Sequence, residues 1–128
     1  MPVSRLAVIA VGGVLGALAR YALALALPFS GPGHWPTATF LANVAGCLAI
    51  GFLATSSRVA AGPDWVRPFA ITGILGGFTT FSAFALESGV LFDGGYVLLG
   101  MGYIVATMAV GLLAVRLGAL AADQGGSS

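Results

Sequence analysis

Lysine is absent from this 128-residue chain, and its five basic residues are all arginine. Four acidic residues leave a net charge of +1, so the chain has no basic footprint of the kind that binds nucleic acid. A single cysteine, Cys47, and a single histidine, His34, exclude an internal disulfide and a cluster of Cys and His metal ligands. Since no nucleophile lies at a sensible spacing from a base, we expect a protein that is not an enzyme.

Charge of either sign is scarce, because charged residues make up 7% of the chain and hydrophobic residues 59%. A soluble domain has about a quarter charged residues, so the composition indicates an integral membrane protein. The apolar residues form four segments of about 20 residues, the length that crosses a bilayer core. We expect one all-α transmembrane domain over residues 1–128, with helices at about 6–27, 37–55, 68–92 and 96–115 and a polar tail at 117–128.

The arginines predict how the chain sits in the bilayer. Four crossings put both termini on the same side, and Arg5, Arg58, Arg67 and Arg116 share that side. The positive-inside rule then predicts that the termini are cytoplasmic. Four packed helices leave no lumen, so a chain that conducts or transports must oligomerise, and a homodimer is the commonest assembly.

The third apolar segment contains an unusual stretch at 73–84, with three glycines and the adjacent threonines Thr79 and Thr80. Glycine leaves the backbone unrestricted, and threonine loses rotamer freedom in a helix. A helix that breaks here exposes free carbonyls and amides at membrane depth, which indicates a site for ions. The alternative is an unbroken helix whose glycines serve close packing.

The first helix carries Gly12 and Gly16, a pair of small residues four apart that allows another helix to approach closely. Arg20 lies one turn further along the same face. An arginine inside a membrane usually faces protein or water, although one near a helix end can also extend to the interface. The sequence leaves both alternatives open.

Polar side chains also mark one face of the second and fourth helices. Thr39, Asn43 and Gly46 lie at i, i+4 and i+7, and Tyr103 and Thr107 lie at i and i+4. The Asn43 amide nitrogen can donate two hydrogen bonds. It can serve an ion, or it can only join two helices.

Phe78, Phe81 and Phe84 recur every three residues along the third segment. Such a stripe is most often packing, but the partially positive edge of each ring can also meet an anion. Glu87 follows three residues later. It is either a proton carrier or a carboxylate at a vestibule near the exit that Asp93 marks.

Together these stretches resemble one family, the Fluc (CrcB) fluoride ion channels. The resemblance covers nearly the whole chain and is carried by GGVLGALARY at 12–21, TFLANVAG at 39–46 and GILGGFTTFSAF at 73–84. It implies an antiparallel, dual-topology dimer in the cell membrane. Such a dimer has two pores and passes fluoride down its gradient, which keeps the cytoplasmic fluoride concentration low.

The resemblance also implies roles for particular residues. The third helix is expected to break at 76–79, and the backbone carbonyls of Gly76 and Thr79 from both subunits are expected to hold one central Na⁺. The residues expected to line the fluoride pathway are Asn43, Phe81, Phe84, Ser82, Thr39, Tyr103 and Thr107. Arg20 and Glu87 are expected at the vestibule.

Three residues depart from the family pattern: Ala83 stands in place of Thr or Ser, Ala38 in place of Gly, and Cys47 in place of Ser. The first removes one hydroxyl from the expected polar track. The arginine bias also fits poorly with dual topology. It leaves a paired homologous subunit as an alternative to the expected partner, a second copy in the opposite orientation.

A fluoride pore must replace tightly held water with donors, and amides, hydroxyls and ring edges do so without a fixed cation that would trap the ion. The rival hypothesis is a proton-coupled exporter of small molecules or cations that resembles the small multidrug resistance transporters. Those proteins depend on a glutamate in the first helix, where this chain has no acidic residue. A third hypothesis, an assembly subunit that transports nothing, has no specific support.

Overall fold

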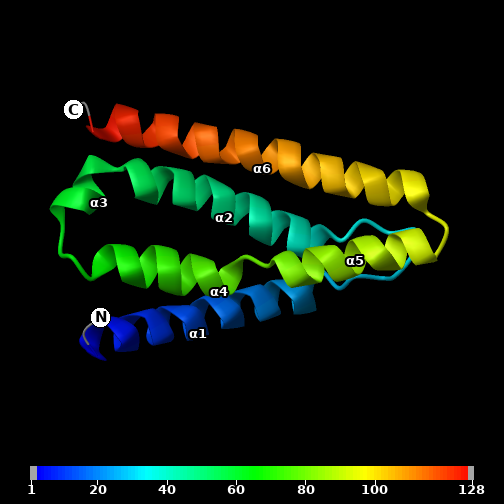
Figure 1. The fold of residues 1–128 in the computed structure, drawn as a ribbon, viewed down its shortest axis with the longest axis horizontal. Coiled ribbons are helices and arrows are strands. Elements are labelled where there is room, and N and C mark those ends of the chain that lie inside the picture. The colour runs from blue at the N-terminus through cyan, green and yellow to red at the C-terminus, as the bar shows by residue number, and fades with distance from the viewer. Residues whose placement is uncertain (1–2, 127–128) are drawn as a thin grey trace.

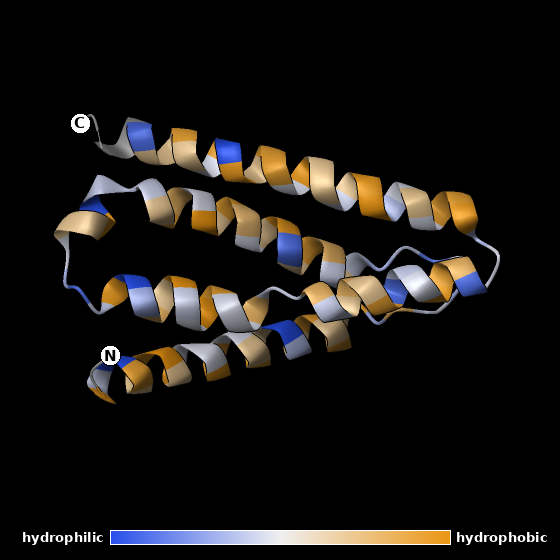
Figure 2. Ribbon diagram, viewed as in Figure 1, coloured by the Kyte–Doolittle hydropathy of each residue, from blue (hydrophilic) through white to orange (hydrophobic). Residues whose placement is uncertain are grey.

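The computed structural model describes residues 3–126, and every regular element in this part of the chain is helical (Figure 1). Within it, four helices are long and apolar enough to cross a membrane, so the predicted all-α class with four spans is confirmed. Between 11% and 22% of the residues in each span are buried, which leaves most of the apolar surface for lipid or for a partner. Figure 2 shows hydrophobic residues along the spans and hydrophilic ones mainly at the ends and at isolated positions within them.

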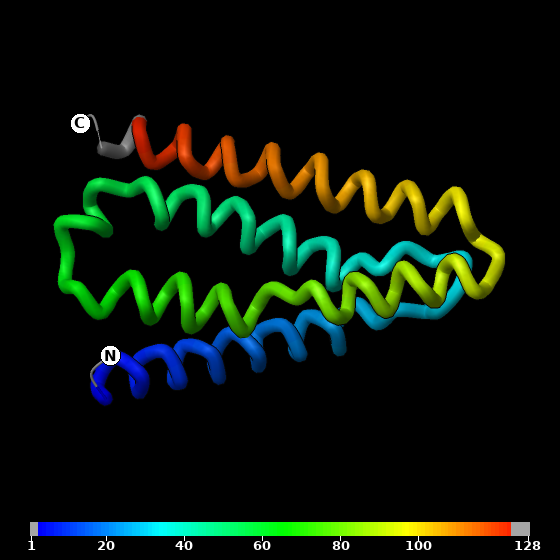
Figure 3. Tube along the Cα trace, in the orientation of Figure 1, coloured from blue at the N-terminus to red at the C-terminus, as the bar shows by residue number. Residues whose placement is uncertain are grey.

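The elements follow one another as α1 (Val3–Ala26), α2 (Thr37–Thr55), α3 (Ser57–Ala61), the π-helix η1 (Pro68–Leu75), α4 (Gly76–Phe78), α5 (Phe81–Asp93) and α6 (Val97–Gly126). The third span is therefore composed of η1, α4 and α5, and its trace straightens briefly between α4 and α5 (Figure 3). Both described ends of the chain lie at the same end of the bundle as α3 (Figure 1). The α1–α2 loop and the α5–α6 turn lie at the other end.

Two helix pairs make up the bundle, because α1 packs on η1 and α4, while α2 packs on α6. Glycine permits the first contact. A Cβ added at Gly12 would lie 2.5 Å from the Phe69 carbonyl oxygen, and one at Gly16 would overlap the Ile74 carbonyl. The predicted role of this glycine pair in close helix packing is confirmed.

The second pair relies on glycine in the same way, since a Cβ at Gly51 would overlap the Val115 carbonyl and one at Gly118 would overlap the Leu48 carbonyl. The contact at Gly118 lies beyond the predicted end of the fourth helix. It keeps the C-terminal part of α6 against α2.

The fourth helix is longer than predicted, because α6 continues to Gly126 where the sequence indicated an end at 115 and a polar tail at 117–128. Residues 117–122 are leucine, alanine and one glycine, and leucine and alanine are strong helix formers. Ala122 is 2% exposed, so this extension is packed. The residues between the second and third predicted helices, 56–67, contain the short helix α3, where the Ser56 hydroxyl accepts a hydrogen bond from the Val59 N–H at 3.4 Å.

The buried aromatic core lies toward the end of the bundle that holds the α1–α2 loop. Phe84, Leu91 and Tyr103 form its centre, and Phe29, Trp35, Phe40, Leu99 and Ile104 pack around it. The third span thus meets α6 through α5 at this end, whereas η1 and α4 lean on α1 toward the other end.

Candidate functional site

The third span is interrupted at two consecutive threonines. The backbone is still helical at Gly76 (φ −61°, ψ −36°) and becomes extended at Thr79 (φ −84°, ψ 156°) and Thr80 (φ −150°, ψ 124°). A broken third helix is therefore confirmed. The predicted range, 76–79, includes the first extended residue, Thr79, but begins too early, since residues 76–78 are still helical and the interruption covers 79–80.

The position of the interruption follows from how the glycines are used. A Cβ at Gly77 would overlap the Gly13 carbonyl of α1, and one at Gly73 would lie 3.0 Å from the Gly12 Cα. These glycines serve close packing inside a helix, as the alternative hypothesis held. The β-branched threonines, which tolerate extended backbone well, provide the break.

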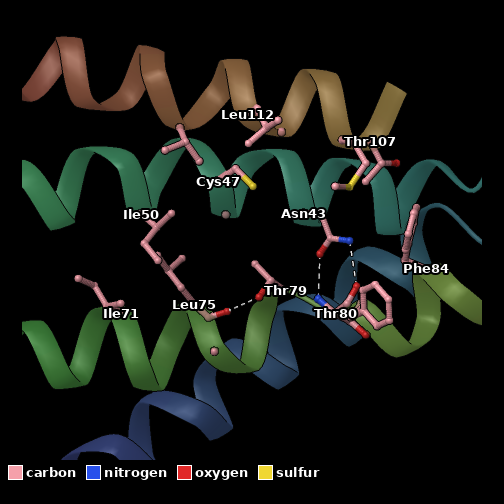
Figure 4. A pocket seen from close by; sticks show the side chains of 16 residues that line it. Asn43, Cys47, Ile50, Ile71, Leu75, Thr79, Thr80, Phe84, Thr107 and Leu112 are labelled. Atoms are coloured by element: carbon pink, nitrogen blue, oxygen red, sulfur yellow. Dashed lines mark hydrogen bonds between the residues drawn. The ribbon is translucent and has the colours of Figure 1, made fainter. Parts of the chain in front are cut away.

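Asn43 of α2 holds the break in place through both polar atoms of its side-chain amide (Figure 4). Its Nδ2 donates to the Thr80 carbonyl oxygen at 2.9 Å, and its Oδ1 accepts from the Thr80 N–H at 2.8 Å. Asn43 thus joins two helices, and one Nδ2 hydrogen remains for another acceptor.

Thr80 is a site residue that the sequence-based prediction omitted. Its hydroxyl accepts from the Ala83 N–H at 3.2 Å and so caps the N-terminus of α5, and it lies 3.2 Å from the Ser82 hydroxyl. A threonine directly before a helix start is a recognised N-cap signal, which could have identified it once the break was located.

The break deprives two carbonyls of their usual helical donors. In a continuous helix the Thr80 N–H would donate to Gly76, and the Ala83 N–H would donate to Thr79. Here the first donates to Asn43 and the second to the Thr80 hydroxyl. Both carbonyls are the ones that the sequence-based prediction assigned to a cation.

Arg20 lies on the other side of the break, on α1. Its Nε donates to the Gly77 carbonyl oxygen at 3.4 Å in a partly buried contact. Of the two alternatives for Arg20, the structure therefore supports a contact with protein. The guanidinium also stands at the C-terminal end of α4, where the helix dipole favours positive charge.

A groove with a volume of about 470 Å³ opens beside the break, between α2 and α6 on one wall and the third span on the other (Figure 4). Among the described residues, none that lines the groove is charged. Its walls bring together six of the predicted site residues: Asn43, Gly76, Thr79, Phe81, Phe84 and Thr107.

The two phenylalanines differ in how much of each ring the chain itself covers. Phe81 is 79% exposed and Phe84 is 8% exposed, with their ring centroids 5.8 Å apart. A ring that lines a groove yet is mostly uncovered at membrane depth must face lipid or a second protein chain. Ser82, the next residue, is exposed and lies outside the groove.

A second polar group lies beside Phe84 and away from the groove wall. The Thr39 hydroxyl donates to Glu87 Oε2 at 3.0 Å, and the fully buried Tyr103 ring lies 5.2 Å from the Phe84 ring. In the described part of the chain, Glu87 Oε1 and the Tyr103 hydroxyl are buried without a hydrogen-bond partner, and so is the hydroxyl of Thr107, which lines the groove. Buried polar atoms are costly unless water or a ligand satisfies them, so this group indicates a hydrated path.

Replacement of Asn43 by alanine is expected to weaken the fold. Both backbone groups of Thr80 then lose their partner at membrane depth, at a cost of about 1–3 kcal/mol for each group left unsatisfied. The measurement is the midpoint of thermal unfolding in detergent. Thr72→Ala, at an exposed position in η1, is the control, and equal midpoints for the two variants would contradict the assigned role.

Fold and site together define an integral membrane protein with four spans, a third helix interrupted near its middle, and an uncharged, mainly apolar groove with a few polar groups at the interruption. The family described as "CrcB-like protein, Camphor Resistance (CrcB)" matches residues 7–119. The chain belongs to this family.

Three relatives of similar length are each named as a fluoride-specific ion channel. The chain is 47% identical over 119 residues to the "Fluoride-specific ion channel FluC 2" of Nocardia farcinica, with 89% of this chain and 81% of that protein covered. It is 46% identical to the "Fluoride-specific ion channel FluC 1" of Streptomyces coelicolor, with 92% and 77% covered. It is 42% identical to the "Fluoride-specific ion channel FluC" of Paracoccus denitrificans, with 86% and 87% covered.

Proposed function

We propose that this chain forms a fluoride-selective channel in the cell membrane, through which fluoride leaves the cytoplasm passively and electrogenically. The observation that carries the proposal is the uncharged groove at the helix break, whose mainly apolar lining includes an amide, hydroxyls and two aromatic rings, in a member of this family. The names of its relatives support the choice of ion.

Four groups along the groove have a role in this proposal. The spare Nδ2 hydrogen of Asn43 and the Thr107 hydroxyl replace water around the anion, and the positive edges of Phe81 and Phe84 provide further contacts. All four groups are neutral, so fluoride is solvated without being held as tightly as a fixed cation would hold it.

Further polar groups lie beside the groove. The hydroxyls of Thr39, Ser82 and Tyr103 extend the polar track, with Tyr103 beside Phe84. Arg20 and Glu87 belong to the vestibules, where a charge can draw in or repel ions before they shed water.

The working unit is an antiparallel dimer. Because Phe81 is 79% exposed beside a groove, a second chain must cover it if it is to line a pore. The partner is a second copy of this chain in the opposite orientation, or alternatively a paired homologous subunit. Two grooves in such a dimer give two pores.

A structural Na⁺ at the dimer centre completes the proposal. Carbonyl oxygens are ligands that hard cations accept, and the Gly76 and Thr79 carbonyls have both lost their helical donors. Gly76 is also exposed within the single chain, so it is accessible to a partner's equivalent group. The residues therefore fit the ion, whose charge would stabilise carbonyls that have lost their helical donors inside the membrane.

The decisive experiment is passive fluoride release from proteoliposomes loaded with potassium fluoride. Release should be fast when valinomycin lets K⁺ compensate the charge, slow without valinomycin, and independent of a proton gradient. Chloride-loaded vesicles should retain their chloride. Release that requires a proton gradient would instead support the proton-coupled exporter, and the absence of release under all conditions would contradict transport of fluoride.

A further inference from the structure

The loop at 27–36, between α1 and α2, is fixed against the α5–α6 turn. Gly33 has φ +87°, and a Cβ there would lie 3.0 Å from the Tyr96 ring. A Cβ at Gly94 would lie 2.6 Å from the Pro32 side chain. Close approach at two glycines holds the loop in a defined place at this end of the bundle (Figure 1).

Trp35 extends from this loop into the aromatic core. Its ring meets Tyr103 edge-on, with centroids 5.3 Å apart and planes at 80°, and it meets Phe40 in the same way at 5.3 Å and 78°. The Thr37 N–H donates to the Trp35 carbonyl at 2.9 Å, which fixes the backbone beside the ring. The indole is thus wedged between α2 and α6.

The contacts continue from Trp35 to the groove. Tyr103 is completely buried, and its ring lies 5.2 Å from the Phe84 ring, which lies 5.8 Å from the Phe81 ring. Phe81 and Phe84 line the groove, whereas Trp35 and Tyr103 do not. Trp35 can therefore influence the groove through the Tyr103 ring, which lies between the indole and Phe84.

We propose that Trp35 is a positioning residue for ion conduction, which holds Tyr103 and thereby sets the ring of Phe84 at the groove. The inference rests on the proposed function, since it assigns a task within the same pathway. Without the indole, the Tyr103 ring has room to turn toward the loop. The Phe84 edge then leaves the orientation that a small anion needs.

The test compares the chain's two tryptophans. Trp65 makes a similar edge-on contact with Phe69, at 5.8 Å, far from the groove and toward the opposite end of the bundle. Trp35→Leu is expected to slow fluoride release by about tenfold, the order of effect expected when aromatic pair contacts are lost. It should also weaken the rejection of chloride, which a change in stability alone would not do.

Three results support the inference when they occur together: Trp65→Leu behaves like the parent chain, Trp35→Phe regains most of the flux, and Trp35→Leu loses it. Parent-like release and chloride rejection in Trp35→Leu would overturn the inference while leaving the channel proposal intact. If the parent chain itself releases no fluoride, the proposed function fails.

A second measurement decides the question if Trp35→Leu does not fold. 4-Fluorophenylalanine placed at position 84 reports its surroundings through its ¹⁹F resonance. Trp35→Met, which keeps an apolar side chain but has no ring, should shift that resonance because Tyr103 loses its edge-on partner, whereas Trp35→Phe and Trp65→Leu should not. An unmoved resonance in Trp35→Met would show that Trp35 does not position Phe84.

Discussion

Phe81→Ile is expected to reduce fluoride release to near background while the protein still folds and assembles. Phe81 is 79% exposed in the single chain, so the fold loses little when its ring is replaced by another apolar side chain. Isoleucine has no positive ring edge for an anion. Loss of one good contact to an ion costs roughly 1.5–3 kcal/mol, which is roughly ten- to hundredfold in rate.

Phe84→Ile should also abolish most fluoride release, but its effect is harder to interpret because it also lowers the stability of the fold. Phe84 is 8% exposed and packs on Tyr103, so its replacement also costs about 1–2 kcal/mol of folding free energy. The measurement is fluoride release read with an electrode, beside elution by size exclusion in detergent.

Phe92→Ile serves as the matched control for both variants. Phe92 lies on the same helix, α5, but outside the groove. It should keep parent-like release. Parent-like release from Phe81→Ile and Phe84→Ile as well would leave the rings as packing residues and refute the aromatic-edge mechanism.

Gly76→Val is expected to leave the chain folded but to prevent assembly and conduction. Within the chain, a Cβ at Gly76 meets only the Ile71 carbonyl, at an ordinary 3.8 Å. The same position lines the groove, where the proposed partner and Na⁺ approach. Bulk at this point should therefore separate the two subunits without disturbing either.

Two other glycines provide control variants for this experiment. Gly16→Val should prevent folding altogether, because its Cβ would overlap the Ile74 backbone, which cannot move aside. Gly102→Val should change nothing, since among the described residues no atom beyond its chain neighbours and its own helix backbone lies within 4 Å of its Cβ, and it does not line the groove. Molecular mass in detergent and fluoride release are measured for all three. A normal dimer with full conductance from Gly76→Val would refute the proposed central site.

The break in the third helix could be predicted from the sequence, but the roles of the residues around it could not. The stretch at 73–84 has too many glycines and threonines for a plain transmembrane helix, and this indicated a break. It could not separate glycines that pack from glycines that bend, because both uses need the same missing side chain. The Gly13 carbonyl of α1 makes that distinction, since it occupies the space a side chain at Gly77 would need.

Boundaries near the ends of spans were hard to predict for a related reason. Arg116 marked the expected end of the fourth helix, yet Gly118 and Ala122 lie buried beyond it. A charge can end the membrane-crossing part of a helix without ending the helix. Contact with α2 stabilises the extension, and that contact is not visible in the local sequence.

By itself the sequence determined the class of protein and the number of spans, and it indicated an interruption of the third span and the residue types near it. These properties depend on composition, segment length and local backbone preference, all of which can be read directly from the sequence. The tertiary structure alone decided that Asn43 holds both backbone groups of Thr80, that Arg20 contacts Gly77, and that Trp35 reaches Phe84 through Tyr103. Each of these contacts joins residues of different helices or loops, and only the packing of the whole bundle brings such residues together.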